Sequence, residues 1–253
     1  TPAQNIGIRV ETRFVDDNLA HALENEAKKL ATDYGYEYDG DTRVRAIDNA
    51  RQQETRQTLR VNNTRVTVRF EKHGQALPPW GYGDEFVRSA LPPAISSLAD
   101  CVESCGHYEL GPLRDVTLNL RRHSFFQLDP HVDPLSDGPN VFVLSLLSSV
   151  VTTFTPPEQL ARDHSLEYRR EPHEVGVRSW CDADIDVLVQ PCTLLHFSGE
   201  ARTTWRHAIR AGVEAPLPEG GSAVCDWWGK TDYLLRRSDE RISIVLAFGD
   251  REA

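Results

Sequence analysis

The sequence predicts an α+β protein that is mainly β, in which two N-terminal helices support a β-sandwich or jelly roll. Helical periodicity is confined to the first 110 residues, whereas from about Val116 the chain is a series of short apolar strands joined by glycine- and proline-rich connections. Some strands alternate and others are almost continuously apolar, as two facing sheets require. We therefore expect a single domain over 1–253, with the helices in 1–110 and the jelly-roll core in 111–253.

The first predicted element is a strand over Ile6–Phe14. Asp16 or Asp17 then suits the N-cap of a helix over Asn18–Ala31, in which apolar residues repeat at helical spacing. The aromatic, glycine-bearing segment Tyr34–Asp41 indicates a loop or a hairpin. The N-terminal part thus combines a strand, a helix and a short turn-rich segment.

A second amphipathic helix is predicted over Pro92–Cys105. The strands expected after it are Val116–Arg121, Val141–Ser148, Val150–Thr155, Glu167–Arg170, Ile185–Val189, Thr193–Phe197, Trp205–Arg210 and Ile242–Phe248. Residues 211–229 form the longest connection, and their glycines and prolines predict an irregular segment.

Composition excludes several classes of protein. Hydrophobic residues make up 40% of the chain and charged residues 26%, which excludes wholesale disorder. No apolar run reaches the roughly 18–20 residues that a membrane helix needs, so no membrane partner is expected. The five dispersed cysteines predict neither a disulfide framework nor a zinc site, which favours an intracellular location, in cytoplasm or nucleus. The chain starts at Thr1 without a leader and lacks methionine, so we expect further residues upstream.

The charge is acidic overall but locally basic. The net charge of −10 argues against a surface that binds phosphates throughout. Arginine nevertheless outnumbers lysine by 24 to 4, and seven arginines lie within 43–72. Arginine recognises carboxylates and phosphates in a planar, bidentate manner. A GC-rich genome would also favour arginine over lysine, but it does not explain the cluster.

The motif Asp129-Pro-His131-Val-Asp133 is the sharpest chemical feature of the sequence. His131 and Asp133 are two residues apart, so at a strand end both point the same way. A second histidine, His207, lies far downstream in Trp205-Arg-His-Ala-Ile. Two histidines and one carboxylate are the ligand set of non-haem Fe(II) oxygenases, in which the remaining metal positions stay open.

Arg241 begins the last predicted strand, and an arginine there can reach into the barrel. A dicarboxylate cosubstrate would chelate iron at one end and meet the guanidinium of Arg241 at the other. The alternative is a surface ion pair between Arg241 and Asp239 or Glu240.

Longer strings resemble the AlkB-like Fe(II)/2-oxoglutarate dioxygenases, most closely the branch of the fourth vertebrate homologue. They are the His131 motif, Leu144-Ser-Leu-Leu-Ser148, and Ser198-Gly-Glu-Ala-Arg-Thr-Thr-Trp-Arg-His-Ala-Ile209. The resemblance implies a double-stranded β-helix, with Fe(II) on His131, Asp133 and His207 and with 2-oxoglutarate held by Arg241. It also implies O2-dependent oxidation of an N-methyl group, with loss of formaldehyde.

The sequence departs from this family at three places. Many members end with Arg-x-Asn-x-Thr-x-Arg, whereas this chain has Arg241-Ile-Ser243-Ile-Val-Leu-Ala247 and so lacks the second arginine. A tyrosine usual on the strand before the His131 motif is also missing, which leaves Asn119 as the expected polar contact to 2-oxoglutarate. The gap between His207 and Arg241 is longer than usual.

The resemblance implies that the region between the first helix and the barrel is a substrate lid. Tyr36, Arg45 and Arg65 lie there, among other tyrosines and arginines, and Trp205 is a further candidate for the wall of the pocket. Aromatic rings beside arginines suit methylated nucleic acid, through base stacking and phosphate contacts. The alternative is that the arginines pair with the acidic surface of the chain.

Two other functions stay open. A protein substrate, such as methyl-lysine, fits the net charge of −10 and the closest branch of the family. A jelly roll that has lost cosubstrate residues could instead be a non-catalytic binding module. The sequence indicates no oligomeric state.

Overall fold

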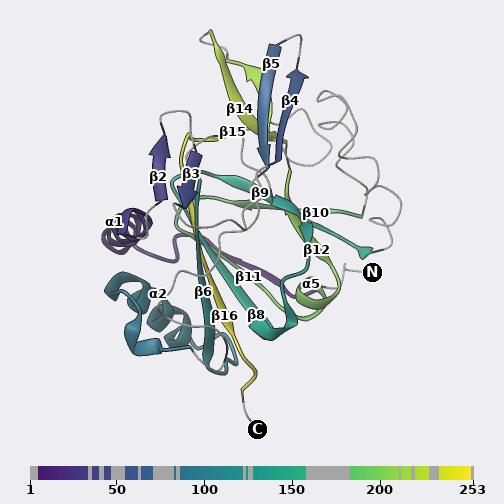
Figure 1. Ribbon diagram of the computed structural model, residues 1–253. Coiled ribbons are helices and arrows are strands. Elements are labelled where there is room, and N and C mark those ends of the chain that lie inside the picture. Colours follow the sequence, from purple (N-terminus) through teal and green to yellow (C-terminus); the bar gives the residue numbers. More distant parts are fainter. Residues whose placement is uncertain are drawn as a thin grey trace.

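The structure is a computed structural model, and its described part is mainly β, as the sequence predicts (Figure 1). It describes residues 5–33, 36–39, 43–46, 55–61, 64–70, 83, 86–121, 124, 128–157, 183–210, 212–217, 220–227 and 234–251. The strand expected at Glu167–Arg170 lies outside the described residues.

A five-stranded antiparallel sheet forms one layer of the molecule, in the order β1-β11-β8-β16-β6. Its strands are β1 (Ile8–Glu11), β11 (Thr193–Phe197), β8 (Asn140–Leu146), β16 (Arg241–Phe248) and β6 (Leu113–Arg121). The last strand of the chain therefore pairs between two earlier ones, β8 and β6. The first strand of the chain lies at the edge of this same sheet.

A four-stranded antiparallel sheet forms the second layer, in the order β10-β9-β12-β7. Its strands are β10 (Ile185–Val189), β9 (Val150–Thr155), β12 (Arg206–Ile209) and β7 (Leu128–His131). The strand β7 is absent from the strands expected above, although the motif that contains His131 was placed at a strand end. Since the chain passes repeatedly between the two sheets, the core is a jelly roll.

The large sheet is apolar on both faces, which explains the continuous apolar run of β16. Ile242 and Ile244 face the outer cluster, where the helices pack. Val245 and Ala247 alternate with them and face the inner cluster between the two sheets. The apolar side chains of β16 therefore pack on both faces of the large sheet, as its continuous apolar run predicts.

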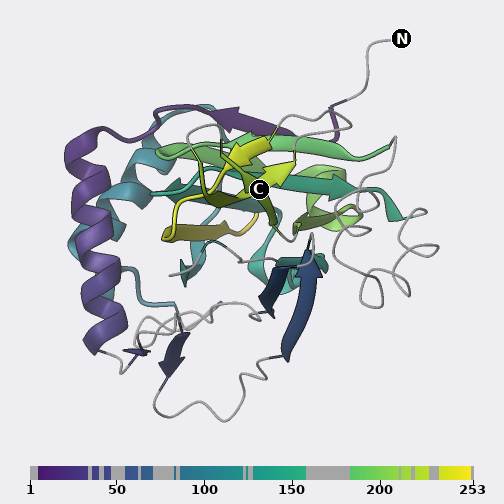
Figure 2. The same cartoon turned by 90° about the horizontal axis from the view of Figure 1, so that it is seen from above.

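Helices α1 (Asp17–Asp33) and α2 (Pro93–Ser104) cover the outer face of the large sheet (Figure 1). Asp16 begins α1, because its carboxylate accepts a hydrogen bond of 2.8 Å from the backbone of Leu19. Glu26 of α1 in turn accepts a backbone hydrogen bond of 2.9 Å from Ile95 at the start of α2. In Figure 2, the view from above, α1 runs along one side of the sandwich.

The remaining described elements are short: η2 (Arg88–Ala90), η3 (Leu135–Asp137), α5 (Gly199–Thr203), and the hairpins β2 (Tyr36–Asp39)–β3 (Arg43–Ala46) and β4 (Thr55–Val61)–β5 (Thr64–Phe70). The hairpin β2–β3 agrees with one of the alternatives predicted for residues 34–41. Among the described residues, no helix has the length and apolar character needed to cross a bilayer.

The described part of 211–229 is largely regular, so the prediction of an irregular connection is wrong for residues 213–216 and 222–227. They contain β13 (Val213–Pro216) and β14 (Ser222–Trp227), which pair with each other, and β15 (Leu234–Arg236) completes a three-stranded sheet. Gly220 and Gly221, both with positive φ, form the turn between β13 and β14. The glycines that suggested a loop therefore make a hairpin.

Candidate functional site

His131, Asp133 and His207 come together at one edge of the small sheet. His131 ends β7 and lies opposite His207 of β12 in the antiparallel register, while Asp133 follows β7 by two residues. Nε2 of His131 lies 3.2 Å from Oδ1 of Asp133, and Nε2 of His207 lies 3.8 Å from the same oxygen. The ligand atoms of the three side chains all lie within 4.8 Å of one another.

This donor set fits a divalent transition metal. Imidazole nitrogens suit iron, and a carboxylate balances part of its charge. The two imidazole ring centroids are 4.1 Å apart, and the ring of Phe197 lies 4.9 Å from that of His207. Aromatic packing therefore borders part of the cluster, and these three residues could hold a metal in the pocket that they line.

The surroundings of Asp133 favour the ionised form of its carboxyl group. Burial raises the pKa of its carboxyl, but the hydrogen bond with His131 and the electrostatic interactions with His207, His131 and Arg202 outweigh burial and lower the pKa to about 2. An ionised carboxylate beside two imidazoles is the form that binds a cation.

Arg202 holds the loop that carries Asp133. Arg202 is 1% exposed, and its guanidinium donates hydrogen bonds to the backbone carbonyls of Asp133, Pro134 and Gly138. Gly138 has a φ of 100°, and a Cβ there would collide with the carbonyl oxygen of Phe248. A buried cation and a glycine therefore fix the path of the chain directly after the ligand.

A pocket between the two sheets contains the cluster and extends to the start of β16. Its other polar side chains are those of Asn119, Arg121, Thr152, Arg241 and Ser243. Its apolar lining consists of Leu128, Val143, Leu195, Phe197, Val245 and Ile209. One pocket therefore joins a candidate metal site to buried cationic side chains.

Arg241 is not a surface residue. It is 5% exposed, and Nη1 donates a 3.2 Å hydrogen bond to Oγ of Ser243. Glu240, the alternative partner, instead forms a 3.0 Å ion pair with Lys28. Burial, together with the charges of Arg121 and Arg237, lowers the pKa of Arg241 to about 9, against an opposing effect of Asp226.

The structure places the other candidate residues away from this pocket or describes only their backbone. Trp205 packs against the inner apolar cluster and does not line the pocket. Tyr36 belongs to β2, Arg45 to β3 and Arg65 to β5. Ala247, at the place of the missing arginine, lies in the inner cluster and is 1% exposed.

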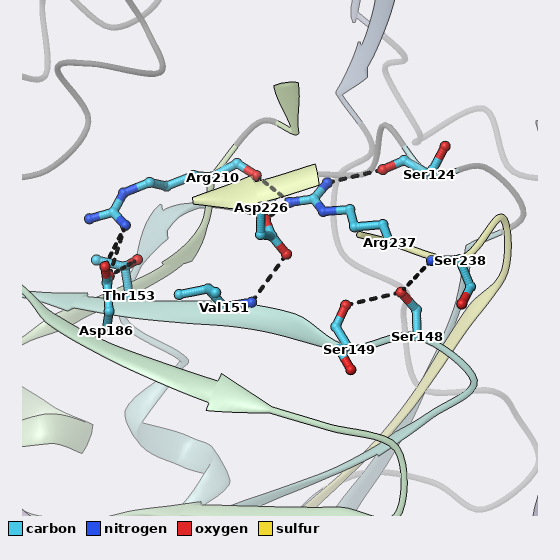
Figure 3. A network of polar contacts seen from close by, with 10 residues as sticks. All are labelled: Ser124, Ser148, Ser149, Val151, Thr153, Asp186, Arg210, Asp226, Arg237 and Ser238. Atoms are coloured by element: carbon cyan, nitrogen blue, oxygen red, sulfur yellow. Dashed lines mark hydrogen bonds and ion pairs between the residues drawn. The ribbon is translucent and has the colours of Figure 1, made fainter. Parts of the chain in front are cut away.

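A buried network connects β13–β15 to the small sheet beside the pocket (Figure 3). Arg237 forms an ion pair with Asp226 and donates a 2.7 Å hydrogen bond to the carbonyl of Arg210. The second carboxylate oxygen of Asp226 accepts a 3.2 Å hydrogen bond from the backbone of Val151 on β9. Both members of the ion pair are 2% exposed, so this contact is fully desolvated.

Sequence reasoning did not assign Arg121 to the site. On β6, Arg121 and Asn119 lie on the same face, because they are two residues apart. The antiparallel register places them opposite Arg241 and Ser243. The two-residue spacing of Asn119 and Arg121 can be read from the sequence. The strand that pairs with β6 cannot.

Comparison with known proteins gives similarities of fold only. No model of a known family matches the sequence, and no curated protein matches it. One similar solved structure is a prolyl hydroxylase in complex with a hypoxia inducible factor oxygen degradation domain peptide fragment from Trichoplax adhaerens, with 14% identity over 97% of this chain and 84% of that chain and a TM-score of 0.46. Another is a prolyl-4-hydroxylase from Pseudomonas putida, with 11% identity, 98% and 90% coverage and a TM-score of 0.44. The function therefore has to be inferred from the side chains of the pocket.

Proposed function

We propose that this protein is an Fe(II)- and 2-oxoglutarate-dependent dioxygenase, an oxidoreductase. The observation that carries the proposal is the convergence of His131, Asp133 and His207 in the pocket that also holds Arg241. Iron bound with 2-oxoglutarate and O2 supplies the oxidation of a C–H bond, coupled to conversion of 2-oxoglutarate to succinate and CO2. A facial set of two histidines and one carboxylate is suited to this chemistry.

The residues of the chain have distinct roles in this proposal. The two imidazoles and the Asp133 carboxylate hold iron, and Arg202 orients Asp133 through its backbone carbonyl. Arg241 binds the distal carboxylate of 2-oxoglutarate, with Ser243 and Asn119 as neighbouring polar contacts. The apolar lining of the pocket excludes water and strengthens these charge-assisted contacts.

We propose methylated nucleic acid as the substrate, with the N-methyl group as the site of oxidation. The AlkB-like resemblance points to this reaction, and the backbone register of β4–β5 adds a physical argument. It sets Arg56 opposite Arg69 and Arg60 opposite Arg65. A hairpin that carries four arginines supplies cationic residues for phosphate contacts.

The position of this hairpin agrees with a lid. Figure 1 shows β4 and β5 at the end of the molecule where β14 and β15 also lie, while the C-terminus lies at the opposite end. Arg241 is the first residue of β16, whose other end leads to the C-terminus. A base or side chain presented by the hairpin would approach the pocket from the end where the hairpin lies.

The alternative substrate is protein, for example methyl-lysine, for which demethylation or hydroxylation uses the same pocket. The net charge of −10 favours a cationic protein partner over a polyanion. A non-catalytic binding module is the remaining alternative, and it requires no metal.

Metal binding tests the dioxygenase proposal directly. Anaerobic titration with Co(II), a spectroscopic substitute for Fe(II), should give stoichiometric binding to the parent protein, weakened at least about 100-fold in His131→Ala. His107→Ala is the matched control, because the side chain of His107 is 61% exposed and outside the pocket. Equal Co(II) affinity in the parent and His131→Ala would refute the proposal.

Product analysis then separates the substrates. The Fe(II)-loaded protein is mixed with 2-oxoglutarate and either N-methylated oligonucleotides or methyl-lysine peptides, and succinate and formaldehyde are measured. Nucleic acid demethylation predicts equal amounts of the two products with oligonucleotides only. Formaldehyde from peptides only would favour the protein substrate, and metal binding without either reaction would favour a different substrate.

A further inference from the structure

The strand that carries His207 is short and is held unevenly by its two neighbours. β12 consists of four residues and lies between β9 and β7. Its register with β9 is continuous, whereas its register with β7 shifts directly after the pair of His207 with His131. Such a shift interrupts the ladder of hydrogen bonds and can re-aim the adjacent side chain. Contacts at the far end of β12 are therefore well placed to fix the direction of His207.

Arg210, the residue that follows β12, is anchored through its side chain. Its Nη1 donates hydrogen bonds to both carboxylate oxygens of Asp186, at 2.8 and 3.0 Å, and its Nη2 donates a 3.0 Å hydrogen bond to Asp184. Asp186 also accepts a 2.7 Å hydrogen bond from the hydroxyl of Thr153 on β9. The side chains of Arg210, Asp184 and Asp186 are 11%, 2% and 5% exposed. This largely desolvated cluster ties the end of β12 to β9 and β10.

The backbone of Arg210 is anchored as well, by the ion pair between Asp226 and Arg237 (Figure 3). Arg237 donates a 2.7 Å hydrogen bond to the carbonyl of Arg210 and a 3.1 Å hydrogen bond to the carbonyl of Ser124. Asp226 accepts its 3.2 Å hydrogen bond from the backbone of Val151 on β9. Asp226 belongs to β14 and Arg237 directly follows β15, so the segment that forms the three-stranded sheet supplies both charges.

The two strands are held directly behind the wall of the pocket. Thr152 of β9 and Ile209 of β12 pair with each other and line the pocket. Their neighbours Val151 and Arg210 are the residues that the ion pair holds. Because side chains alternate along a strand, the side chain of Arg210 lies on the face opposite to that of His207. The network therefore acts on the metal-binding strand from behind, without entering the pocket.

We propose that Arg210 and Arg237 are positioning residues that orient His207 for metal binding, so that the segment of β13–β15 is a functional part of the metal site. The inference rests on the dioxygenase function proposed above and goes beyond it, because neither arginine lines the pocket. Loss of the ion pair releases the carbonyl of Arg210, and the end of β12 can then move relative to β9. Metal affinity and coordination geometry should change together, since contacts that orient a ligand also tune the metal.

A variant without buried unpaired charge tests this role. Asp226→Leu/Arg237→Met removes both members of the ion pair, so neither charge stays buried without its partner. In anaerobic Co(II) titration its affinity should be about 10- to 100-fold weaker than that of the parent, and the visible absorption spectrum of bound Co(II) should change. Leu98→Ala is the control for stability, because Leu98 is 0% exposed in the cluster between the helices and the large sheet. It should keep the parental affinity and spectrum.

The outcomes separate this inference from the proposed function. If the double variant keeps the parental Co(II) affinity and spectrum, the positioning role is wrong and the dioxygenase proposal stands. If Leu98→Ala loses as much affinity as the double variant, the effect reflects stability alone and the inference is again wrong. If the parent binds Co(II) no better than His131→Ala, both proposals are wrong.

A second variant covers the case in which the double variant does not fold, as judged by urea unfolding. Arg237→Lys keeps a counter-charge for Asp226 but lacks the fork that reaches the carbonyls of Arg210 and Ser124. Its Co(II) affinity should fall about 10-fold, with a changed spectrum of the bound metal. Parental affinity and spectrum in Arg237→Lys would overturn the inference.

Discussion

The guanidinium of Arg202 donates a 2.9 Å hydrogen bond to the backbone carbonyl of Asp133, although 69 residues separate the two in sequence. The same side chain reaches the carbonyls of Pro134 and Gly138, so one buried cation holds the loop that follows β7. Its charge also helps to keep the pKa of Asp133 low. Arg202 therefore positions a candidate metal ligand without contacting the metal-binding atoms itself.

Replacement of Arg202 by methionine should impair both stability and metal binding. Three backbone carbonyls would lose their charged hydrogen-bond donor, which costs about 3–5 kcal/mol in the free energy of unfolding. Co(II) affinity should fall about 10- to 100-fold, because the backbone that orients Asp133 is released. Urea unfolding and anaerobic Co(II) titration measure the two effects. Arg236→Met provides the exposed control, and a destabilised Arg202→Met with parental Co(II) affinity would restrict Arg202 to a structural role.

Gly138 should tolerate no side chain, since its backbone is strained for other residues and its surroundings are closed. Gly138→Ala places a Cβ against the carbonyl of Phe248, in addition to a φ of 100°. Gly106 has a φ of 70°, but no atom lies within 4 Å of the place that a Cβ would occupy, so Gly106→Ala reports the conformational cost alone. We expect a loss of about 1 kcal/mol for Gly106→Ala and at least about 2 kcal/mol more for Gly138→Ala, by urea unfolding. Equal losses would show that the loop can shift away from Phe248.

Breaking the buried ion pair between Asp226 and Arg237 should lower the free energy of unfolding far more than breaking an exposed ion pair. Asp226→Asn leaves Arg237 buried without its counter-charge, which costs about 3–5 kcal/mol. Glu24→Gln breaks the 2.7 Å pair with Lys28, which is partly exposed, and should cost less than about 1 kcal/mol. The double variant Asp226→Leu/Arg237→Met should lose less free energy of unfolding than the sum of the losses in Asp226→Leu and Arg237→Met. Additive losses would mean that the two side chains act independently.

The fold class could be predicted because the hydrophobic pattern of each strand in the sequence matches the faces that the strand buries in the structure. The strand at Val150–Thr155 and the strand at Ile185–Val189 have the predicted bounds, since both are short apolar runs that end at turns. The close approach of His131 and Asp133 was likewise predictable, because a spacing of two residues fixes their common side. These features depend on neighbours in sequence.

Features that depend on distant segments could not be predicted. The strands β13 and β14 contain or adjoin turn-forming glycines, and only their pairing with each other distinguishes them from a loop. Arg202 binds backbone carbonyls, which carry no sequence signal. The place of Arg121 in the pocket depends on the register of β6 against β16. In each case the partner is set by the tertiary fold rather than by local spacing.

His196 should make the stability of the protein fall in mild acid. It lies on β11, 7% exposed, where its ring stacks on Phe142 at 4.4 Å and its Nε2 lies 3.0 Å from Oδ1 of Asn140. Burial and the charge of Arg9 lower the pKa of His196 to about 4, against an opposing effect of Glu11. The ordinary pKa of histidine in an unfolded chain is about 6.5. Between these values the unfolded chain binds the extra proton and the folded protein does not.

The sign of the effect follows from this difference. Because the unfolded state binds more protons between pH 6.5 and pH 4, the free energy of unfolding decreases as the pH falls through this window. The contribution of His196 is about 1–3 kcal/mol. His196→Gln, which cannot titrate, should lower stability at pH 7 but flatten its decline between pH 6.5 and pH 4, as measured by urea unfolding at several pH values. His107→Gln, at an exposed position, should keep the parental pH dependence. If the free energy of unfolding declines as steeply in His196→Gln as in the parent, other titrating groups cause the decline.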